Sequence, residues 1–288
     1  MTAYAAPAEA PVVAEHRGFR QRWYRTPSFV AGVCILGGIV LLAILAPLVT
    51  WHDASEQDLV NILQGSSWNH PLGTDDLGRD VWTRLVYGAR TDLQIAFLAV
   101  IFPFVLGTVG GLIAGYYGSR ADTLVNWLVS IVVAFPFYVL VIALVFALGP
   151  GTRNIYIAIT MVGWVSYTRI VRGEVLVAKR QEYVLAAQAA GLSGRRILVR
   201  HLLPNVITQA VVFAMSDVVL VILAIVTLGY LGLGVQPPTP DWGRMIADGQ
   251  GFLTTNWQLS TVPGIAVVIT ALGLSLLADG LADLLRPE

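Results

Sequence analysis

The sequence is poor in charged residues and in cysteine. Only 12% of its 288 residues are charged, Lys179 is the only lysine, and Cys34 is the only cysteine. A single cysteine excludes an intrachain disulfide, and a water-soluble domain of this size would need a more polar surface. Hydrophobic residues instead make up 56% of the chain. The composition therefore predicts a protein whose outer surface is covered largely by lipid rather than by water.

The sequence also lacks the signatures of an ATP site and of an active site. A phosphate-binding loop needs the pattern Gly-x-x-x-x-Gly-Lys-Ser/Thr, but Lys179 is followed by Arg180. The four histidines form no pair at metal-ligand spacing, and no Ser-His-Asp or Cys-His pattern converges on one region. We therefore expect no catalytic residue, no metal and no cofactor in this chain. Any ATP and Mg²⁺ would be bound by a partner.

Six apolar stretches are long enough to cross a membrane as helices, which takes about 20 residues each. Residues 1–27 are predicted to form an N-terminal tail, and residues 28–288 an all-α membrane domain. The first stretch exceeds the roughly 7–15 residues of a signal-peptide core, so we expect it to stay in the mature protein. The predicted spans are about 28–50, 92–117, 123–148, 154–173, 207–232 and 260–284.

The distribution of basic residues predicts the orientation of these spans. With a cytoplasmic N-terminus, thirteen arginines and lysines fall in inner segments and five in outer segments. Basic residues are enriched on the cytoplasmic side of membrane proteins, so both termini are predicted to be cytoplasmic. Two outer loops, 51–91 and 233–259, and one inner loop, 174–205, are then long enough to carry function.

The inner loop has the pattern of two short helices separated by a glycine. Alanines at 186 and 187 favour a thin first helix, and Gly191 suits its left-handed end. Ser193 can cap the second helix, whose first turn would hold Arg195 and Arg196 although the helix dipole disfavours positive charge there. This arrangement indicates contact with acidic lipid or with an acidic partner. The alternative is an ordinary interfacial helix whose arginines serve only the orientation of the chain.

The spacing of this loop resembles the EAA loop of ABC importer permeases. Ala-Ala, three residues, Gly, eleven residues and a final Leu-Pro match that motif, although Leu185 stands where glutamate is usual and Glu182 lies one turn earlier. The resemblance implies a coupling helix that docks into a groove on a cytoplasmic ATPase. The residues implied in this coupling are Glu182, Leu185, Ala186, Ala187, Gly191, Arg195, Arg196 and Pro204.

Two outer segments resemble the C-type permease of dipeptide, oligopeptide and nickel importers. They are His-Pro-Leu-Gly-Thr-Asp-Asp-Leu-Gly-Arg-Asp-Val-Trp at 70–82 and Leu-Gly-Leu-Gly-Val-Gln-Pro-Pro-Thr-Pro-Asp-Trp-Gly-Arg-Met at 231–245. The resemblance implies a type I ABC importer permease fold in the bacterial cytoplasmic membrane, with peptides favoured over nickel or another small solute. It further implies a second homologous permease as heterodimer partner, separate ATPase subunits and an extracytoplasmic substrate-binding protein, with no role for nucleic acid.

Both outer segments allow a simpler interpretation. Trp82, Trp242 and Arg244 are predicted to receive the binding protein, although tryptophans at this level also anchor proteins at the membrane boundary. Asp75 and Asp80, with the acid between them, could suggest a metal site, since hard cations prefer carboxylates. Solvated acids in a hydrated loop are the preferred interpretation.

Within the predicted spans, two features stand out. Gly107, Gly111 and Gly115 repeat every four residues and predict close packing against a neighbouring helix, of this chain or of a partner permease. Asp217 is an acid inside an apolar run, where a charge is costly. It could line the translocation path, but pairing with an inner-loop arginine near the cytoplasmic surface is favoured slightly.

Two other classes of function were weighed against an importer subunit. An ion-coupled carrier working alone would need several buried charges near mid-membrane, and Asp217 is the only clear candidate. An intramembrane enzyme would need a paired nucleophile and base or clustered metal ligands. The sequence therefore predicts a transport subunit without enzymatic activity of its own.

Overall fold

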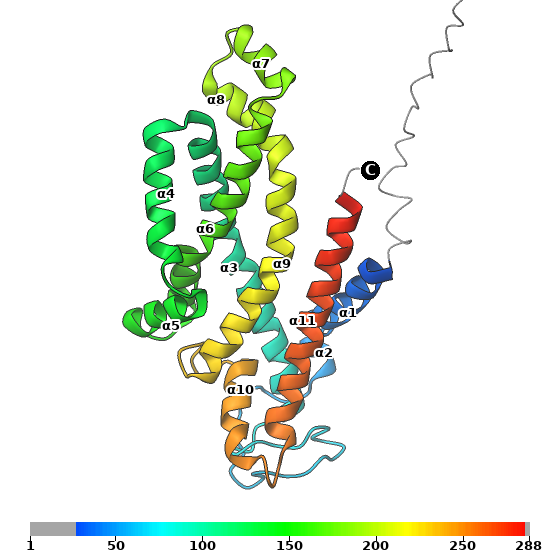
Figure 1. Cartoon of the computed structure of the whole chain (residues 1–288). Coiled ribbons are helices and arrows are strands. Elements are labelled where there is room, and N and C mark those ends of the chain that lie inside the picture. The colour runs from blue at the N-terminus through cyan, green and yellow to red at the C-terminus, as the bar shows by residue number, and fades with distance from the viewer. Residues whose placement is uncertain (1–26, 286–288) are drawn as a thin grey trace, which may run out of the picture.

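The chain is a bundle of long helices with one long loop and two groups of short helices at its ends. The computed structural model describes residues 27–285, so the predicted tail 1–27 lies almost wholly outside it. Figure 1 shows α7 and α8 at one end of the bundle and α10 with the loop before α3 at the other. The helices are α1 (Pro27–Ile44), α2 (Ala46–Val49), α3 (Val81–Tyr117), α4 (Ser119–Val133), α5 (Phe137–Leu148), α6 (Thr152–Ala178), α7 (Glu182–Ala189), α8 (Gly194–Ile197), α9 (Leu203–Tyr230), α10 (Trp242–Gly249) and α11 (Gln258–Leu285).

Helix α3 begins earlier than the hydrophobic pattern predicts. Its first residue is Val81 rather than residue 92, because Asp80 caps it by accepting a hydrogen bond from the Thr83 amide. It ends at Gly118, whose φ of 61° suits a residue without a side chain. With 37 residues, α3 is about 55 Å long, well beyond the hydrocarbon thickness, so its first turns reach into the outer loop.

The third predicted span is not one straight helix, and in this the prediction was wrong. It is divided into α4 and α5, which meet at an angle of 86°. Pro136 follows the break and has no amide hydrogen to continue the hydrogen-bond ladder. The apolar pattern continues through the break, which is why composition alone does not reveal it.

Four helical runs in residues 27–285 are long and apolar enough to span a membrane, and the bent pair would make a fifth. The four are α1, α3, the run from α8 through α9, and α11. Helix α6, which covers the predicted span 154–173, has 27 residues but does not qualify on composition. The number six therefore stays a prediction, whereas the all-helical architecture agrees with the sequence.

Helix α9 is entered through a wider turn than an α-helix has. The chain passes from α8 into a π-helical turn, Leu198–Leu202, before α9 starts at Leu203. Pro204 has no amide hydrogen, and the π turn accommodates it because the Leu203 amide bonds to the carbonyl of Leu198 instead. Pro204 thus lies in the first turn of α9, as expected, but the preceding helix continues into α9 without a break.

Candidate functional site

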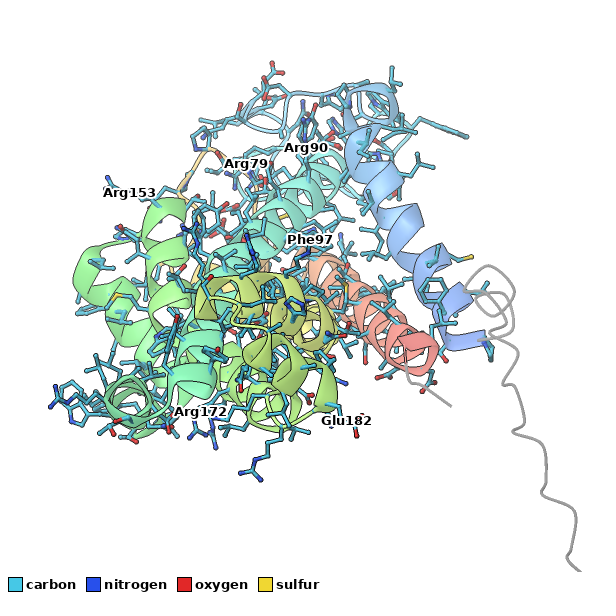
Figure 2. All side chains as sticks on the ribbon, turned by 90° about the horizontal axis from the view of Figure 1, so that it is seen from above. Arg79, Arg90, Phe97, Arg153, Arg172 and Glu182 are labelled. Atoms are coloured by element: carbon cyan, nitrogen blue, oxygen red, sulfur yellow. The ribbon has the colours of Figure 1, made fainter. Side chains whose placement is uncertain are left out.

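The loop of α7 and α8 presents one face to the outside and uses the other to hold itself in place. Val184 and Ala187 are buried, while Leu185 and Ala186 are exposed. Glu182 starts the helix and lies at the edge of the molecule in Figure 2, which is viewed from this end. The outward face therefore carries the small Ala186 and the larger apolar Leu185 next to one acid. Ala187 belongs to the inward face, which the sequence did not distinguish.

Gly191 ends α7 in the left-handed conformation that the sequence predicts. Its φ is +75°, its amide donates to the carbonyl of Gln188, and the Leu192 amide donates to the carbonyl of Ala187. These two bonds form a Schellman motif, which favours glycine at this position. A side chain at 191 would meet no atom within 4 Å, so the backbone conformation rather than space selects glycine.

Arg195 and Arg196 lie in the four-residue helix α8, and both are exposed. Ser193 occupies the N-cap position but makes no capping bond with its side chain, contrary to expectation. The two guanidinium groups therefore stand at a helix N-terminus without a compensating cap, available to an acidic surface.

The three glycines of α3 face α6 of the same chain. A Cβ added to Gly111 would lie 2.7 Å from the carbonyl oxygen of Thr168 and 2.9 Å from the amide of Arg172. Gly115 would meet Val175 at 2.8 Å. The hydroxyl of Thr168 also donates to the carbonyl of Gly107 at 3.2 Å. Of the two neighbours left open by the sequence, the structure places an internal helix against this stripe.

Asp217 lies near the middle of α9 and is bonded by a tyrosine, so the predicted arginine partner is wrong. The side chain is 8% exposed, and the hydroxyl of Tyr167 donates to its Oδ2 at 2.7 Å. The ring of Tyr167 stands edge-on between Phe104 and Phe213. This aromatic environment ties α6 to α9 and excludes bulk water from the carboxylate.

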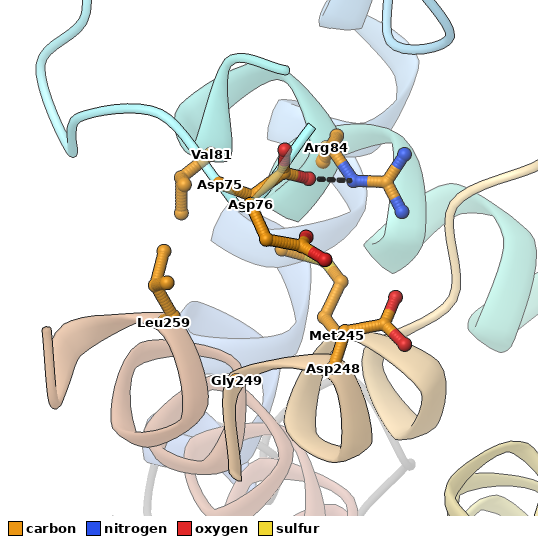
Figure 3. A pocket seen from close by; sticks show the side chains of 8 residues that line it. All are labelled: Asp75, Asp76, Val81, Arg84, Met245, Asp248, Gly249 and Leu259. Atoms are coloured by element: carbon orange, nitrogen blue, oxygen red, sulfur yellow. Dashed lines mark ion pairs between the residues drawn. The ribbon is translucent and has the colours of Figure 1, made fainter. Parts of the chain in front are cut away.

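Asp75 and Asp80 of the outer loop are buried and paired rather than solvated, which corrects the preferred interpretation for these two acids. Asp75 pairs with Arg79 at 2.7 Å and with the buried Arg84 at 3.5 Å. Figure 3 shows this pair across a cavity from Asp248 of α10. The cavity has room for about one water at roughly 20 Å³. This charge network joins the loop before α3 to α10.

Two of the three residues predicted to receive a binding protein are engaged inside the chain. Trp242 is 1% exposed, and its indole donates to the carbonyl of Leu85, so it offers no docking surface in this conformation. Trp82 donates to the carbonyl of Val49 and shares an apolar cavity of about 140 Å³ with Trp242. Arg244 remains partly exposed, although it is paired with Asp248 at 2.8 Å.

The loop before α3 exposes two large apolar residues that lie apart from the predicted docking residues. Trp68 is 98% exposed and Val60 is 90% exposed, in a loop that is otherwise held by hydrogen bonds. The signal was present as isolated apolar residues between turn-forming ones. A tryptophan in such a loop could equally have been expected to fold inward.

The structure brings together two histidines and an acid that are separated in the sequence. His52, His70 and Asp80 place ligand atoms within 4.8 Å of one another, which could hold a metal ion. However, His70 bonds Asp80 at 3.0 Å, His52 bonds the carbonyl of Asn69, and the two rings stack at 4.6 Å. Parallel rings direct their in-plane lone pairs alongside each other rather than at a common point. Hydrogen bonding accounts for this cluster.

A wider cavity of about 490 Å³ lies open beside α6. It is lined by Phe102 of α3 and by Arg153, Tyr156 and Thr160 of α6, among others. These α6 residues recur at three- and four-residue intervals and so share one face of the helix. An arginine, a tyrosine and a threonine on one face favour contact with water or protein over contact with lipid.

Such a bundle, apolar outside, with an exposed two-helix loop at one end, has the architecture expected of a membrane-embedded transport subunit. The family model "Binding-protein-dependent transport system inner membrane component" matches residues 107–288, and "N-terminal TM domain of oligopeptide transport permease C" matches residues 17–66. The chain belongs to this family of ABC importer permeases. It is an inner membrane component with several helices, and in this family the ATPase is a separate subunit.

Curated relatives cover most of the chain. It is 41% identical to the dipeptide transport system permease protein DppC of Alkalihalophilus pseudofirmus, over 90% of this chain and 85% of that one. It is 36% identical to the di/tripeptide permease DppC of Pseudomonas aeruginosa, over 98% and 96% of the two chains. It is 38% identical to the oligopeptide permease OppC of Bacillus subtilis, over 90% and 85%.

A solved structure of the MetNI methionine ABC transporter in an inward-facing conformation has the same fold. One of its chains matches with a TM-score of 0.56 at 20% identity, covering 70% of this chain and 97% of that one. At this identity the likeness concerns the fold alone. It agrees with the importer permease fold implied by the sequence.

Proposed function

We propose that this chain is the C-type permease of an importer for di- and oligopeptides, working as one half of a heterodimer with a second, homologous permease. The observation that carries the coupling role is the outward face of α7, where Leu185 and Ala186 stand exposed at one end of the bundle. The substrate class is supported by the relatives above, which are named for dipeptide, di/tripeptide and oligopeptide transport.

In this proposal, α7 enters a groove on a cytoplasmic ATPase that binds ATP and Mg²⁺. The small side chain of Ala186 on its outward face allows close approach there, and Gly191 fixes the angle at which α8 follows. Arg195 and Arg196 would meet acidic groups of the ATPase or of the lipid. The α7 end and both termini would be cytoplasmic, and the loop before α3 would face outward.

The opposite end would receive the substrate-binding protein. The exposed residues of the loop before α3, above all Trp68, provide an aromatic anchor of the kind that contributes most at protein interfaces. Arg244 lies on the neighbouring α10 and adds a partly exposed charge. In this proposal, Trp82 and Trp242 do not dock the binding protein but hold this end of the bundle together.

The open cavity beside α6 would form part of the translocation path. A second permease could close it and leave the mixed polar face of Arg153, Tyr156 and Thr160 against water and solute. Asp217 does not line this cavity and is bonded to Tyr167. We therefore assign Asp217 to the packing of α6 on α9 rather than to the path.

Reconstitution tests the proposed function directly. The chain would be co-expressed with its co-purifying permease, ATPases and binding protein, placed in vesicles, and supplied with labelled dipeptides and tripeptides. We expect uptake that requires ATP and the binding protein. Transport by the purified chain without an ATPase would contradict the proposal in favour of an ion-coupled carrier, and uptake of Ni²⁺ but of no peptide would contradict the substrate class.

Trp68→Ala is expected to weaken binding of the substrate-binding protein about tenfold or more, which is typical for an aromatic anchor. The unfolding temperature should not change, because the side chain is 98% exposed. The dissociation constant would be measured with the permease complex in nanodiscs. Trp127→Ala, at a 60% exposed tryptophan of α4, is the matched control. Equal effects of the two substitutions would remove Trp68 from the docking surface.

A further inference from the structure

Two carboxyl groups are buried against each other where α3 meets the start of α10. Asp92 of α3 and Asp241, the N-cap residue of α10, are each 0% exposed. They are far apart in the sequence, yet the amide of Trp242 donates to Asp92 Oδ2 at 3.1 Å. Since Trp242 directly follows Asp241, this bond places the two acids next to each other. This pair is not used by the coupling loop, the cavity beside α6 or the exposed outer loop.

One oxygen of each carboxyl group is satisfied by the backbone and the other is not. Asp241 Oδ1 accepts from the amide of Gly243 at 2.9 Å. Asp92 Oδ1 and Asp241 Oδ2 are buried and have no donor among the described residues. A buried carboxylate oxygen without a donor is costly, and two of them in adjacent groups need a common explanation.

Neighbouring cations do not supply that explanation. Arg244 is the charged side chain that acts on Asp241, but its guanidinium is directed to Asp248 at 2.8 Å. Asp241 is the charged group that acts on Asp92. Two carboxylates that share a buried site cannot both ionise cheaply, because each charge disfavours the other.

The surroundings leave no room for a metal ion. A Cβ on Gly229 would collide with Asp241 Oδ2, and one on Gly234 would lie 3.2 Å from the same atom. Neither acid lines any of the three cavities described above. The two glycines thus enclose the unpaired oxygen closely, and a proton is the ligand that fits.

We propose that Asp92 and Asp241 form a proton-binding site, in which one proton is held between Asp92 Oδ1 and Asp241 Oδ2 and joins α3 to the loop before α10. The proton is taken up from the solvent when the pair is buried during folding; it forms an O–H bond with one carboxylate, and that hydroxyl donates a hydrogen bond to the other. The site connects two segments that are far apart in the sequence. It therefore acts as a latch at the end of the bundle that carries α10.

The charge of this latch makes stability depend on pH in a defined direction. Burial raises the pKa of Asp241 to about 6 from its ordinary 3.8. A carboxyl whose pKa is raised in the fold binds a proton more tightly there than in the unfolded chain. Stability is therefore greatest at acid pH and declines as the pH rises from about 4 through 6.

The proposal is tested by infrared spectroscopy and thermal unfolding of the purified chain in nanodiscs. At pH 5, below the raised pKa of about 6, the wild type should show a carbonyl band of a protonated carboxylic acid that is missing in Asp92→Asn and in Asp241→Asn. From pH 5 to pH 8, the wild-type unfolding temperature should fall by about 5 °C. In the two variants this fall should shrink to half or less, because an asparagine amide donates without titrating.

Asp58→Asn is the matched control, since Asp58 is exposed and bonds to Asn61 and Val60 hold its pKa below the ordinary value. It should remove no carboxylic acid band and leave the pH dependence as in the wild type. If Asp92→Asn and Asp241→Asn retain every band of the wild type, no proton is shared and the proposal is overturned. Asp92→Leu distinguishes a latch from plain burial: it should lower the unfolding temperature where Asp92→Asn does not.

Discussion

Ala186→Glu is expected to reduce ATP-driven uptake at least tenfold while the chain remains in the membrane at wild-type abundance. Ala186 is exposed on the outward face of α7, so a larger charged side chain there does not disturb the packing of the loop. It would instead add bulk and negative charge where a thin helix has to enter a groove. The loss is measured as peptide uptake in vesicles with the complete complex. ATP hydrolysis that no longer responds to the binding protein would accompany it.

Gln188→Glu provides the control for this substitution. It introduces the same charge on the same helix at an exposed position, but about 160° away from Ala186 around the helix axis and so away from the outward face. Ala187 would not serve, because it is buried and a glutamate there would disrupt the loop itself. Normal uptake by Ala186→Glu, or equal losses for both variants, would show that the outward face of α7 has no specific role in coupling.

Gly107→Val is expected to abolish the folded permease rather than its coupling. Even a single Cβ at this position would collide with the carbonyl oxygen of Trp164 and the Cβ of Tyr167. Since backbone of α6 lies on the far side of the contact, the two helices would have to separate, at a cost of about 3 kcal/mol or more. The amount of chain in the membrane and its unfolding temperature report the effect.

Gly110→Ala is the matched control on the same helix. A Cβ at Gly110 would lie 3.3 Å from the hydroxyl oxygen of Thr168, a side-chain atom that can move slightly. We expect near-normal abundance, because the better helix propensity of alanine offsets part of the destabilisation caused by this contact. If Gly107→Val accumulated and unfolded like the wild type, the close approach of α3 and α6 would not be required for stability.

The parts of the molecule that depend on local spacing could be predicted from the sequence. Gly191 is recognisable because the left-handed end of α7 is a property of a few neighbouring residues. The long apolar runs predict helices for the same reason. Only the structure shows that Gly107 faces α6, because a stripe of small residues does not identify the helix that packs against it.

Several of the errors concern the environment of polar or aromatic side chains. Trp242 was expected on the surface, but its indole bonds to Leu85 and its amide to Asp92, and neither contact leaves a local trace. Asp75 was expected in water, but it is paired with Arg79 and with the buried Arg84, both inside the same predicted loop. Burial of polar residues is decided by such long-range pairs, which a single sequence does not reveal.

The continuous run from α8 through α9 has a mechanical consequence. From Gly194 to Tyr230 it comprises 37 residues, about 55 Å of rod, with the π turn as its one wide joint. At its far end Gly229 touches the carboxyl group of Asp241. A force applied at the α8 end would thus be transmitted along one continuous helix to the opposite end of the bundle. The π turn beside Pro204 is the point at which that helix would bend first.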